Sequence, residues 1–338
     1  MTIEYDLQML SLYENEVKNS QLIIQHNPDL FSVDFVSQLD VSHLSIIKCV
    51  NLTSISSSAL SHLTIEDCSL STLDNINTPN IQSLGLSKNS LQLNALQQLN
   101  CSFRQLRILD ISFNKKVDIS FIDQNIQELN ISGCEINIEL LKTRLLTKLL
   151  CNWNGVKQIT HLNAFRDLTE LQLQANLITE VSTLQYLRQL KKLNVSYNKI
   201  TSISALRPLK QLTYLDLSNN ELTQADPLID LKQLAKLHIT GNKIRNFNLL
   251  QTHPNFKQFQ VVGQYQLKKK DKIMFPKIKL TDVSTTVLIQ IHTNRIKTKL
   301  HIQEMKIGIQ QTLDLLYQRQ NNFLNYISSI FDNTHGFQ

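Results

Sequence analysis

The middle of the chain repeats one pattern of apolar and polar residues at a constant spacing of 22 residues. Between residues 168 and 251 the pattern LxxLxLxxNxL occurs four times, beginning at Leu168, Leu190, Leu212 and Leu234. Within each copy two apolar residues flank one polar residue, which is the alternation of a short β-strand. One strand of this length cannot bury its apolar side, so the copies must stack as parallel strands around a shared interior.

A polar residue closes each predicted strand at the point where the backbone turns away. Its side chain must satisfy inward-facing backbone groups, each of which costs about 1 to 3 kcal/mol when it is buried without a partner. This ladder position is occupied by Asn89, Asn114, Cys134, Asn154, Asn176, Asn198, Asn220 and Asn242. Because a thiol is a weak donor, Cys134, like Cys49 and Cys68 in earlier copies, is interpreted as structural, not as a redox or metal site.

The repeat continues toward the N-terminus with spacings between 19 and 25 residues. We predict about twelve units over residues 19–267, starting with degenerate copies near Asn19 and Val41. After each ladder residue, apolar residues recur at every third position, which predicts 3₁₀ or extended returns on the convex side. The predicted fold class is therefore α/β, a solenoid with a curved parallel sheet and an irregular convex side. Residues 1–18 carry apolar residues at helical spacing and are predicted to form a helical cap.

The composition changes at Lys268, where the repeat pattern stops. Residues 268–338 contain eleven Lys or Arg against five Asp or Glu, a net charge of +6, which equals that of the whole chain. We predict a basic linker over residues 268–282 and an amphipathic helix or coiled coil over residues 283–338, through which the chain could self-associate. A strand over residues 283–291 is the alternative.

The 22-residue unit resembles the SDS22-like class of leucine-rich repeats over roughly residues 19–264. The segment His253-Pro254-Asn255-Phe256-Lys257-Gln258-Phe259 is similar to the phrase that closes many intracellular members. This class includes the regulatory subunit of protein phosphatase 1 that gives it its name. The resemblance implies a non-enzymatic scaffold that binds a protein partner on the concave sheet.

Three aromatic residues occupy the position just before the ladder residue in alternate units. They are Phe113, Trp153 and Tyr197, and strand spacing predicts about 10 Å between them. Leu150 projects from the same strand as Trp153 onto the concave face. Exposed aromatic residues of this kind dominate many interfaces, so we predict a partner-binding site here. The alternative is that the rings only pack over the adjoining loop at the sheet edge.

The basic residues Lys268, Lys269, Lys270 and Lys272 suggest a second function, an adaptor for RNA or an anionic membrane. A solvated linker is the competing explanation. The nine His are dispersed, and neither HExxH, GxGxxG nor GxxxxGK[ST] is present, so we expect no enzyme, no cofactor and no metal. The acidic N-terminus, the lack of a long apolar run and the scattered cysteines predict a cytoplasmic protein, with the nucleus as the alternative, that is neither secreted nor membrane-spanning.

Overall fold

The computed structural model describes residues 15–18, 20–39, 41–115, 117–122, 125–143, 145–245 and 252–255. The chain divides into two units, Met1–Lys272 and Ile273–Gln338, and all described residues belong to the first. The predicted basic linker, C-terminal helix and last repeat after residue 255 therefore lie outside the described residues. No helix in the described part is long and apolar enough to cross a membrane.

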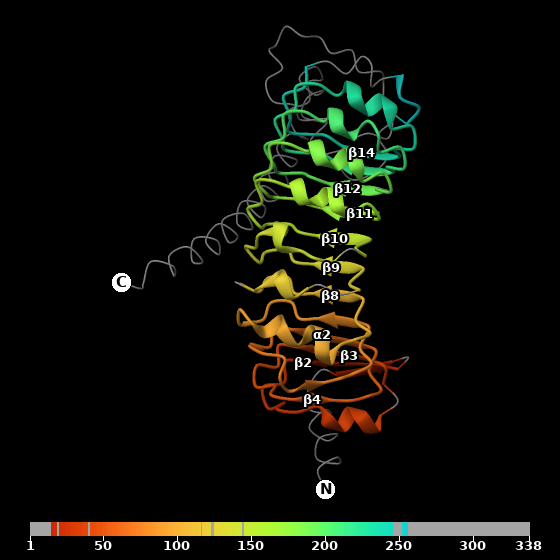
Figure 1. The fold of residues 1–338 in the computed structure, drawn as a ribbon. Coiled ribbons are helices and arrows are strands. Elements are labelled where there is room, and N and C mark those ends of the chain that lie inside the picture. The colour runs from red at the N-terminus through yellow and green to blue at the C-terminus, as the bar shows by residue number, and fades with distance from the viewer. Residues whose placement is uncertain are drawn as a thin grey trace, which may run out of the picture. The chain divides into compact units, whose positions relative to one another are not determined.

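A sheet of twelve strands forms the framework of the described residues (Figure 1). Its strands are β1 (Asn15–Lys18), β2 (Gln21–Gln25), β3 (His43–Ile47), β5 (His62–Glu66), β7 (Ser83–Gly85), β8 (Ile108–Asp110), β9 (Glu128–Asn130), β10 (Lys148–Leu150), β11 (Glu170–Gln172), β12 (Lys192–Asn194), β13 (Tyr214–Asp216) and β14 (Lys236–His238). From β2 onward every strand pairs in parallel with the next copy. The predicted parallel solenoid is thus confirmed.

The first strand corrects the predicted N-terminal cap. Residues 15–18 were expected at the end of a helix, but they form β1, which pairs antiparallel with β2 from Asn15↔Ile24 to Lys18↔Gln21. The exposed edge of the first repeat explains the difference, because β2 has unpaired backbone donors and acceptors that an added strand satisfies. Residues 1–14 of the predicted cap lie outside the described residues.

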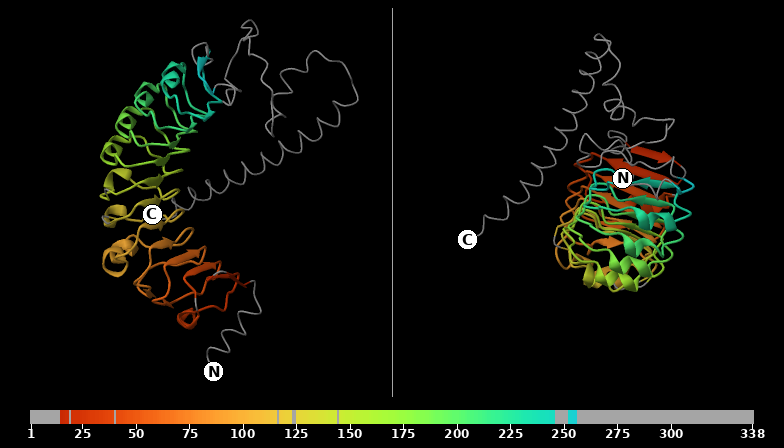
Figure 2. Two further views of the ribbon diagram at one scale, coloured as in Figure 1. Left: turned by 90° about the vertical axis from the view of Figure 1, so that its right-hand side faces the viewer. Right: turned by 90° about the horizontal axis from the view of Figure 1, so that it is seen from above.

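Short 3₁₀ segments return the chain from one strand to the next, as the three-residue spacing predicted. They are η1 (Asp34–Gln38), η2 (Ala95–Gln98), η3 (Ile119–Phe121), η4 (Ile138–Leu140), η5 (Thr160–Ala164), η6 (Ser182–Tyr186), η7 (Ser204–Leu206) and η8 (Asp226–Asp230). One α-helical turn, α2 (Leu99–Ser102), follows η2, and β4 (Ile55–Ser56) pairs with β6 (Ile76–Asn77) in a second sheet. Figure 2 shows the strands on the inner side of the curve and the 3₁₀ turns on the outer side.

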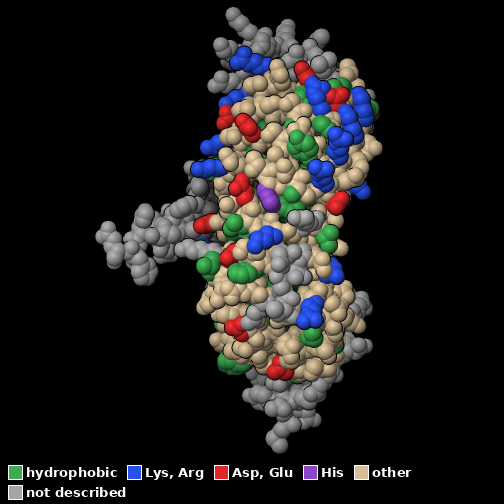
Figure 3. All heavy atoms as spheres, in the orientation of Figure 1, with side chains coloured by type: hydrophobic (Ala, Val, Ile, Leu, Met, Phe, Trp, Pro, Cys, Tyr) green, Lys and Arg blue, Asp and Glu red, His purple; other side chains and the backbone are tan. Residues whose placement is uncertain are grey.

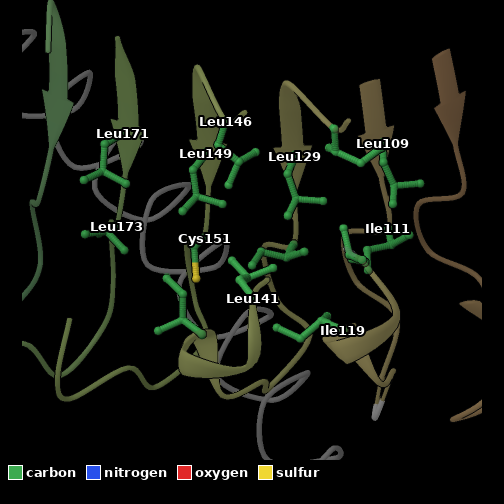
Figure 4. Close-up of a cluster of buried hydrophobic side chains, with 14 of the residues drawn as sticks. Leu109, Ile111, Ile119, Leu129, Leu141, Leu146, Leu149, Cys151, Leu171 and Leu173 are labelled. Carbon is green, nitrogen blue, oxygen red and sulfur yellow. The ribbon is translucent and has the colours of Figure 1, made fainter. Parts of the chain in front are cut away.

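The core lies between the sheet and these returns. Each strand directs its repeat leucine inward, and Leu109, Leu129, Leu149 and Leu171 line up in one buried row (Figure 4). A second row follows two residues later, where Ile111, Cys151 and Leu173 are fully buried. The apolar interior is therefore continuous from one copy to the next, which is the expected source of stability in a repeat array.

The ladder side chains bridge successive copies. Asn176 Nδ2 donates to the carbonyl oxygens of Cys151 and Leu173 at 2.9 and 3.0 Å. Its Oδ1 accepts from the backbone N–H groups of Asn154 and Val156 at 3.1 and 3.0 Å. At the same position the Cys134 thiol donates to the Ile111 carbonyl at 3.1 Å. One amide thus contacts five backbone groups in two neighbouring units, since Nδ2 also donates to the Gln174 carbonyl at 3.3 Å. A thiol at this position donates and, in Cys68, also accepts from the Cys49 N–H at 3.3 Å.

Candidate binding surface

The residue just before the ladder position adopts a left-handed backbone conformation in most copies. Its φ is 57° at Phe113, 53° at Trp153 and 54° at Tyr197. The N–H group of Trp153 donates to the Gln174 carbonyl at 3.0 Å. Backbone hydrogen bonds between neighbouring copies therefore continue past the end of β10. This turn is common to the repeat, so the three aromatic residues stand on a backbone that the neighbouring copies hold in place.

The rings of Phe113 and Trp153 contact each other across the unit that separates them. Their centroids are 6.1 Å apart with an interplanar angle of 35°. Gly133 occupies the same position in the intervening unit, and a Cβ atom there would lie 2.7 Å from Cδ1 of Phe113. The absence of a side chain at Gly133 therefore lets the Phe113 ring lie over the intervening unit. The two rings are closer than the predicted spacing of about 10 Å, which describes only the backbone.

Of the other two predicted site residues, Leu150 lies on the strand that leads to Trp153, and Tyr197 lies two units further along the sheet. Leu150 is on the solvent side of β10, partly exposed between Asn130 of β9 and Gln172 of β11. Tyr197 is 56% exposed, whereas Phe113 and Trp153 are each 39% exposed. Ala175 holds the equivalent position between Trp153 and Tyr197, and Leu177, two residues beyond it, is also exposed. We call Phe113, Leu150, Trp153 and Tyr197 the aromatic surface.

Charged residues occupy the first position of several strands. Lys148 pairs with Glu128 at 3.5 Å, and Lys192 pairs with Glu170 at 3.4 Å. The Lys236 ammonium lies 5.5 Å from the centroid of the Tyr214 ring. These lysines, which share one column of the repeat, are thus engaged by neighbours on the sheet surface.

Two stacked histidines lie nearer the N-terminal end of the same sheet face, where sequence reasoning had placed no feature. His43 and His62 occupy paired positions of β3 and β5, with ring centroids 4.0 Å apart and an interplanar angle of 10°. The hydroxyls of Ser42 and Ser61 contact their Nδ1 atoms at 2.8 and 2.9 Å. Burial and the neighbouring His43 lower the pKa of His62. The Ser-His pair at the same position of two consecutive units was the sequence signal for this arrangement.

The described cysteines have the environment of core residues. Cys49, Cys68, Cys134 and Cys151 are buried free thiols. Burial raises the pKa of Cys134 to about 11 and that of Cys151 to about 12, which suppresses the reactive thiolate. In the part of the chain that is described, no group of three or more His, Cys, Asp or Glu is arranged to hold a metal ion. The residues Lys268, Lys269, Lys270 and Lys272 lie outside that part.

Comparison with known proteins agrees with this geometry. The "Leucine rich repeat" family matches residues 166–222, and "Leucine Rich repeats (2 copies)" matches residues 210–252. An internalin (inlF) from Listeria monocytogenes str. 4b F2365 has a similar fold, with a TM-score of 0.56, 19% identity and coverage of 72% of this chain and 73% of that chain. A second internalin, C2 (inlC2) from the same organism, has a TM-score of 0.47, 24% identity and coverage of 52% and 78%.

No curated protein matches the chain. The two family matches cover the regular copies, and the parallel strands, 3₁₀ returns and ladder contacts extend the same geometry back to β2. The inlF likeness supports the solenoid fold. Residues 166–252 match leucine-rich repeat models, and the other described copies share their strand and turn geometry.

Proposed function

We propose that this protein is a non-enzymatic scaffold that binds a protein partner on the inner face of its sheet, with the aromatic surface as the centre of contact. The single observation that carries the proposal is the exposed indole of Trp153, fixed at the end of β10 and supported by the Phe113 ring at 6.1 Å. Partly exposed aromatic residues on a rigid support lose little conformational entropy on binding, and such residues dominate interface energies.

The neighbourhood of Trp153 supports this choice of centre. Leu150 adds an apolar side chain in a column whose neighbours, Asn130 and Gln172, are polar. Polar residues around an apolar centre are the usual composition of a protein interface. A regulatory-subunit role and the SDS22-like class are parts of this proposal that rest on the resemblance of the repeat. A cytoplasmic location is a further part, which rests on the acidic N-terminus, the scattered cysteines and the lack of a long apolar run.

The test compares a site variant with a matched control. The variant Leu150→Ser/Trp153→Ala removes one leucine and one aromatic ring from the inner face. The control Leu140→Ser/Tyr186→Ala removes the same two kinds of side chain from η4 and η6, where both are exposed. Each full-length protein is used as bait for affinity purification with quantitative mass spectrometry.

We expect partners recovered by the wild-type protein and the control to be depleted more than tenfold by the site variant. Loss of an interface anchor costs about 2 kcal/mol or more, which corresponds to a roughly 30-fold weaker affinity. Equal recovery by all three proteins would refute the site. Circular dichroism of each variant separates loss of binding from loss of folding.

A second candidate function is an adaptor for RNA or an anionic membrane that works through the basic C-terminal segment. The observation in its favour is the excess of eleven Lys or Arg over five Asp or Glu in residues 268–338. Binding through phosphate contacts weakens steeply with salt, so affinity should fall by orders of magnitude between about 50 and 200 mM salt. A salt-insensitive interaction rules this candidate out.

A further inference from the structure

Charge is separated along the repeat region, although its sum is small. Residues 20–144 contain eight Lys or Arg and twelve Asp or Glu, a net charge of −4. Residues 145–245 contain thirteen Lys or Arg and seven Asp or Glu, a net charge of +6. Figure 3 shows Lys and Arg side chains gathered along one side of the C-terminal repeats, which Figure 1 colours green to cyan.

Four basic residues recur at one position of the regular repeats. They are Arg166, Arg188, Lys210 and Lys232, each two residues before the first leucine of its copy. All four are exposed. We call these four residues the basic strip.

The backbone holds the four positions in one geometry. Each lies inside a turn in which the repeat leucine donates its N–H to the carbonyl three residues earlier, as Leu190 does to Leu187 at 3.0 Å. The equivalent bonds at Leu168, Leu212 and Leu234 are 3.2, 3.1 and 2.9 Å long. The strands that follow, β11 to β14, pair in register. Successive members of the basic strip therefore lie on neighbouring copies, with a spacing set by the strand separation of about 5 Å.

The basic strip is not neutralised by carboxylates of the described residues. Among those residues, Arg166, Arg188 and Lys232 form no ion pair, and Lys210 donates to the backbone carbonyl of Asp230 at 3.0 Å. The Asp230 carboxylate is instead paired with Arg207. Four cations in a row repel one another in the free protein, and an anionic partner relieves that repulsion.

We propose that the basic strip binds an extended acidic segment of the partner protein. An extended chain with Asp or Glu at alternate positions presents a carboxylate about every 7 Å on one side. Long, flexible Lys, Arg and Glu side chains bridge the difference from the strip's spacing, and the guanidinium groups of Arg166 and Arg188 fit carboxylates with two parallel hydrogen bonds. This inference deepens the proposed function, since it names the chemistry of the partner.

Single-stranded nucleic acid is a weaker fit to the same strip. Proteins that bind it without sequence preference combine cations with several aromatic rings on which successive bases stack. The strip has one exposed ring near it in sequence, that of Tyr186, whereas Trp153 and Tyr197 follow their strands at the opposite end. The strip thus has a row of cations but no row of aromatic rings, which favours an acidic peptide over single-stranded nucleic acid as its ligand.

The experiment measures binding of a fluorescent ten-residue peptide of alternating Glu and Ser to the full-length chain by anisotropy. The strip variant is Arg166→Gln/Arg188→Gln/Lys210→Gln/Lys232→Gln. The control, Lys48→Gln/Lys115→Gln/Lys142→Gln/Lys157→Gln, removes the same charge from four exposed lysines elsewhere. The basic C-terminal segment is identical in every protein, so a difference in affinity between the strip variant and the control arises from the substituted residues.

We expect the strip variant to bind at least tenfold more weakly than wild type and the control to stay within twofold. Equal weakening in the two variants, or no binding by the wild type, overturns the proposal. Stronger binding of oligouridine than of the peptide, lost in the strip variant alone, assigns the strip to nucleic acid and also overturns it.

The two proposals can fail separately. The peptide assay does not depend on Trp153. If peptide binding requires the strip but partner recovery is unchanged in Leu150→Ser/Trp153→Ala, only the proposal for the aromatic surface is refuted. If partner recovery falls in Leu150→Ser/Trp153→Ala but peptide binding is unchanged in the strip variant, only the proposal for the basic strip is refuted.

Discussion

The ring of Phe113 lies over the backbone of Gly133, in the space that a Cβ atom at residue 133 would need. The closest approach would be 2.7 Å, shorter than Cβ atoms tolerate. Gly133 also has a φ of +68°, so its lack of a side chain serves both the turn and the neighbouring ring. The contact between Phe113 and Trp153 therefore depends on a residue that belongs to neither of their units.

Replacing this glycine should disturb both stability and the aromatic surface. We expect Gly133→Ala to lower the free energy of unfolding by about 2 to 3 kcal/mol, from backbone strain and displacement of the ring. Gly155→Ala is the control, because its φ is +67° but nothing lies within 4 Å of its added Cβ atom, so it should cost about 1 kcal/mol. Urea unfolding measures both values. Equal costs would contradict the role assigned to the Phe113 ring.

The indole of Trp153 offers a spectroscopic check of the same contact. It is the single tryptophan of the chain, so all intrinsic indole fluorescence reports on this surface. We expect Phe113→Ala and Gly133→Ala to shift the emission to longer wavelength, because both expose more of the indole to water, while Gly155→Ala leaves it unchanged. A spectrum that none of the three substitutions alters would show that Phe113 does not shield Trp153.

The ladder predicts a graded response to substitution. Asn176→Ala leaves the N–H groups of Asn154 and Val156 and the Cys151 carbonyl without their hydrogen-bond partner, and partial access of water should limit the loss to about 3 kcal/mol. The Leu173 carbonyl still accepts from Asn198 at 2.9 Å. Asn176→Cys should cost less, because Cys134 shows that a thiol at this position still donates to a carbonyl. Chemical denaturation orders the variants. If the alanine variant is as stable as the cysteine variant, the hydrogen bond donated by the thiol does not stabilise the fold.

The stacked histidines predict an acid-sensitive contribution to stability. The pKa of His62 is below its usual value of 6.5, first because burial disfavours the charged form and second because His43 repels it. The unfolded chain therefore takes up the proton first, so stability is lost as the pH falls from 6.5 toward the folded pKa. NMR titration of the imidazoles should give a His62 pKa below 6.5 that rises in His43→Gln. A folded-state pKa equal to 6.5 would remove the effect, and a higher one would reverse its sign.

Burial distinguishes the ladder cysteine Cys134 and the strand cysteine Cys151 from reactive thiols. Burial raises the pKa of Cys134 and Cys151 to about 11 and 12, so neither is ionised to a useful extent at pH 8. We expect an aromatic disulfide reagent to leave both unmodified in the folded protein and to label them once urea unfolds it, as mapped by peptide mass spectrometry. Rapid labelling of either residue without denaturant would place it at an accessible surface.

The solenoid could be predicted from the sequence because, in a repeat protein, the local pattern of each copy also determines its contacts with the next copy. Leu171 and Leu193 must both face inward, and equal spacing brings them into register on adjacent strands. The helical prediction failed at residues 15–18 because apolar spacing ignored the edge of β2, whose free backbone groups are satisfied by an antiparallel strand. The pairing of residues 15–18 with β2 depends on the free edge of the sheet, which the local spacing of apolar residues does not reveal.

The aromatic surface shows the same division between sequence and tertiary structure. The period placed Phe113, Trp153 and Tyr197 at one position of alternate units, and it fixed their backbones at multiples of the strand spacing. Ring positions depend on the space that neighbouring units leave, and Gly133 leaves enough for Phe113 to reach Trp153. Periodicity alone determined the stacking of the copies, because buried leucines and ladder amides recur with it. Side-chain contacts between copies were decided by the tertiary structure, because they depend on the shape of residues that the period leaves free.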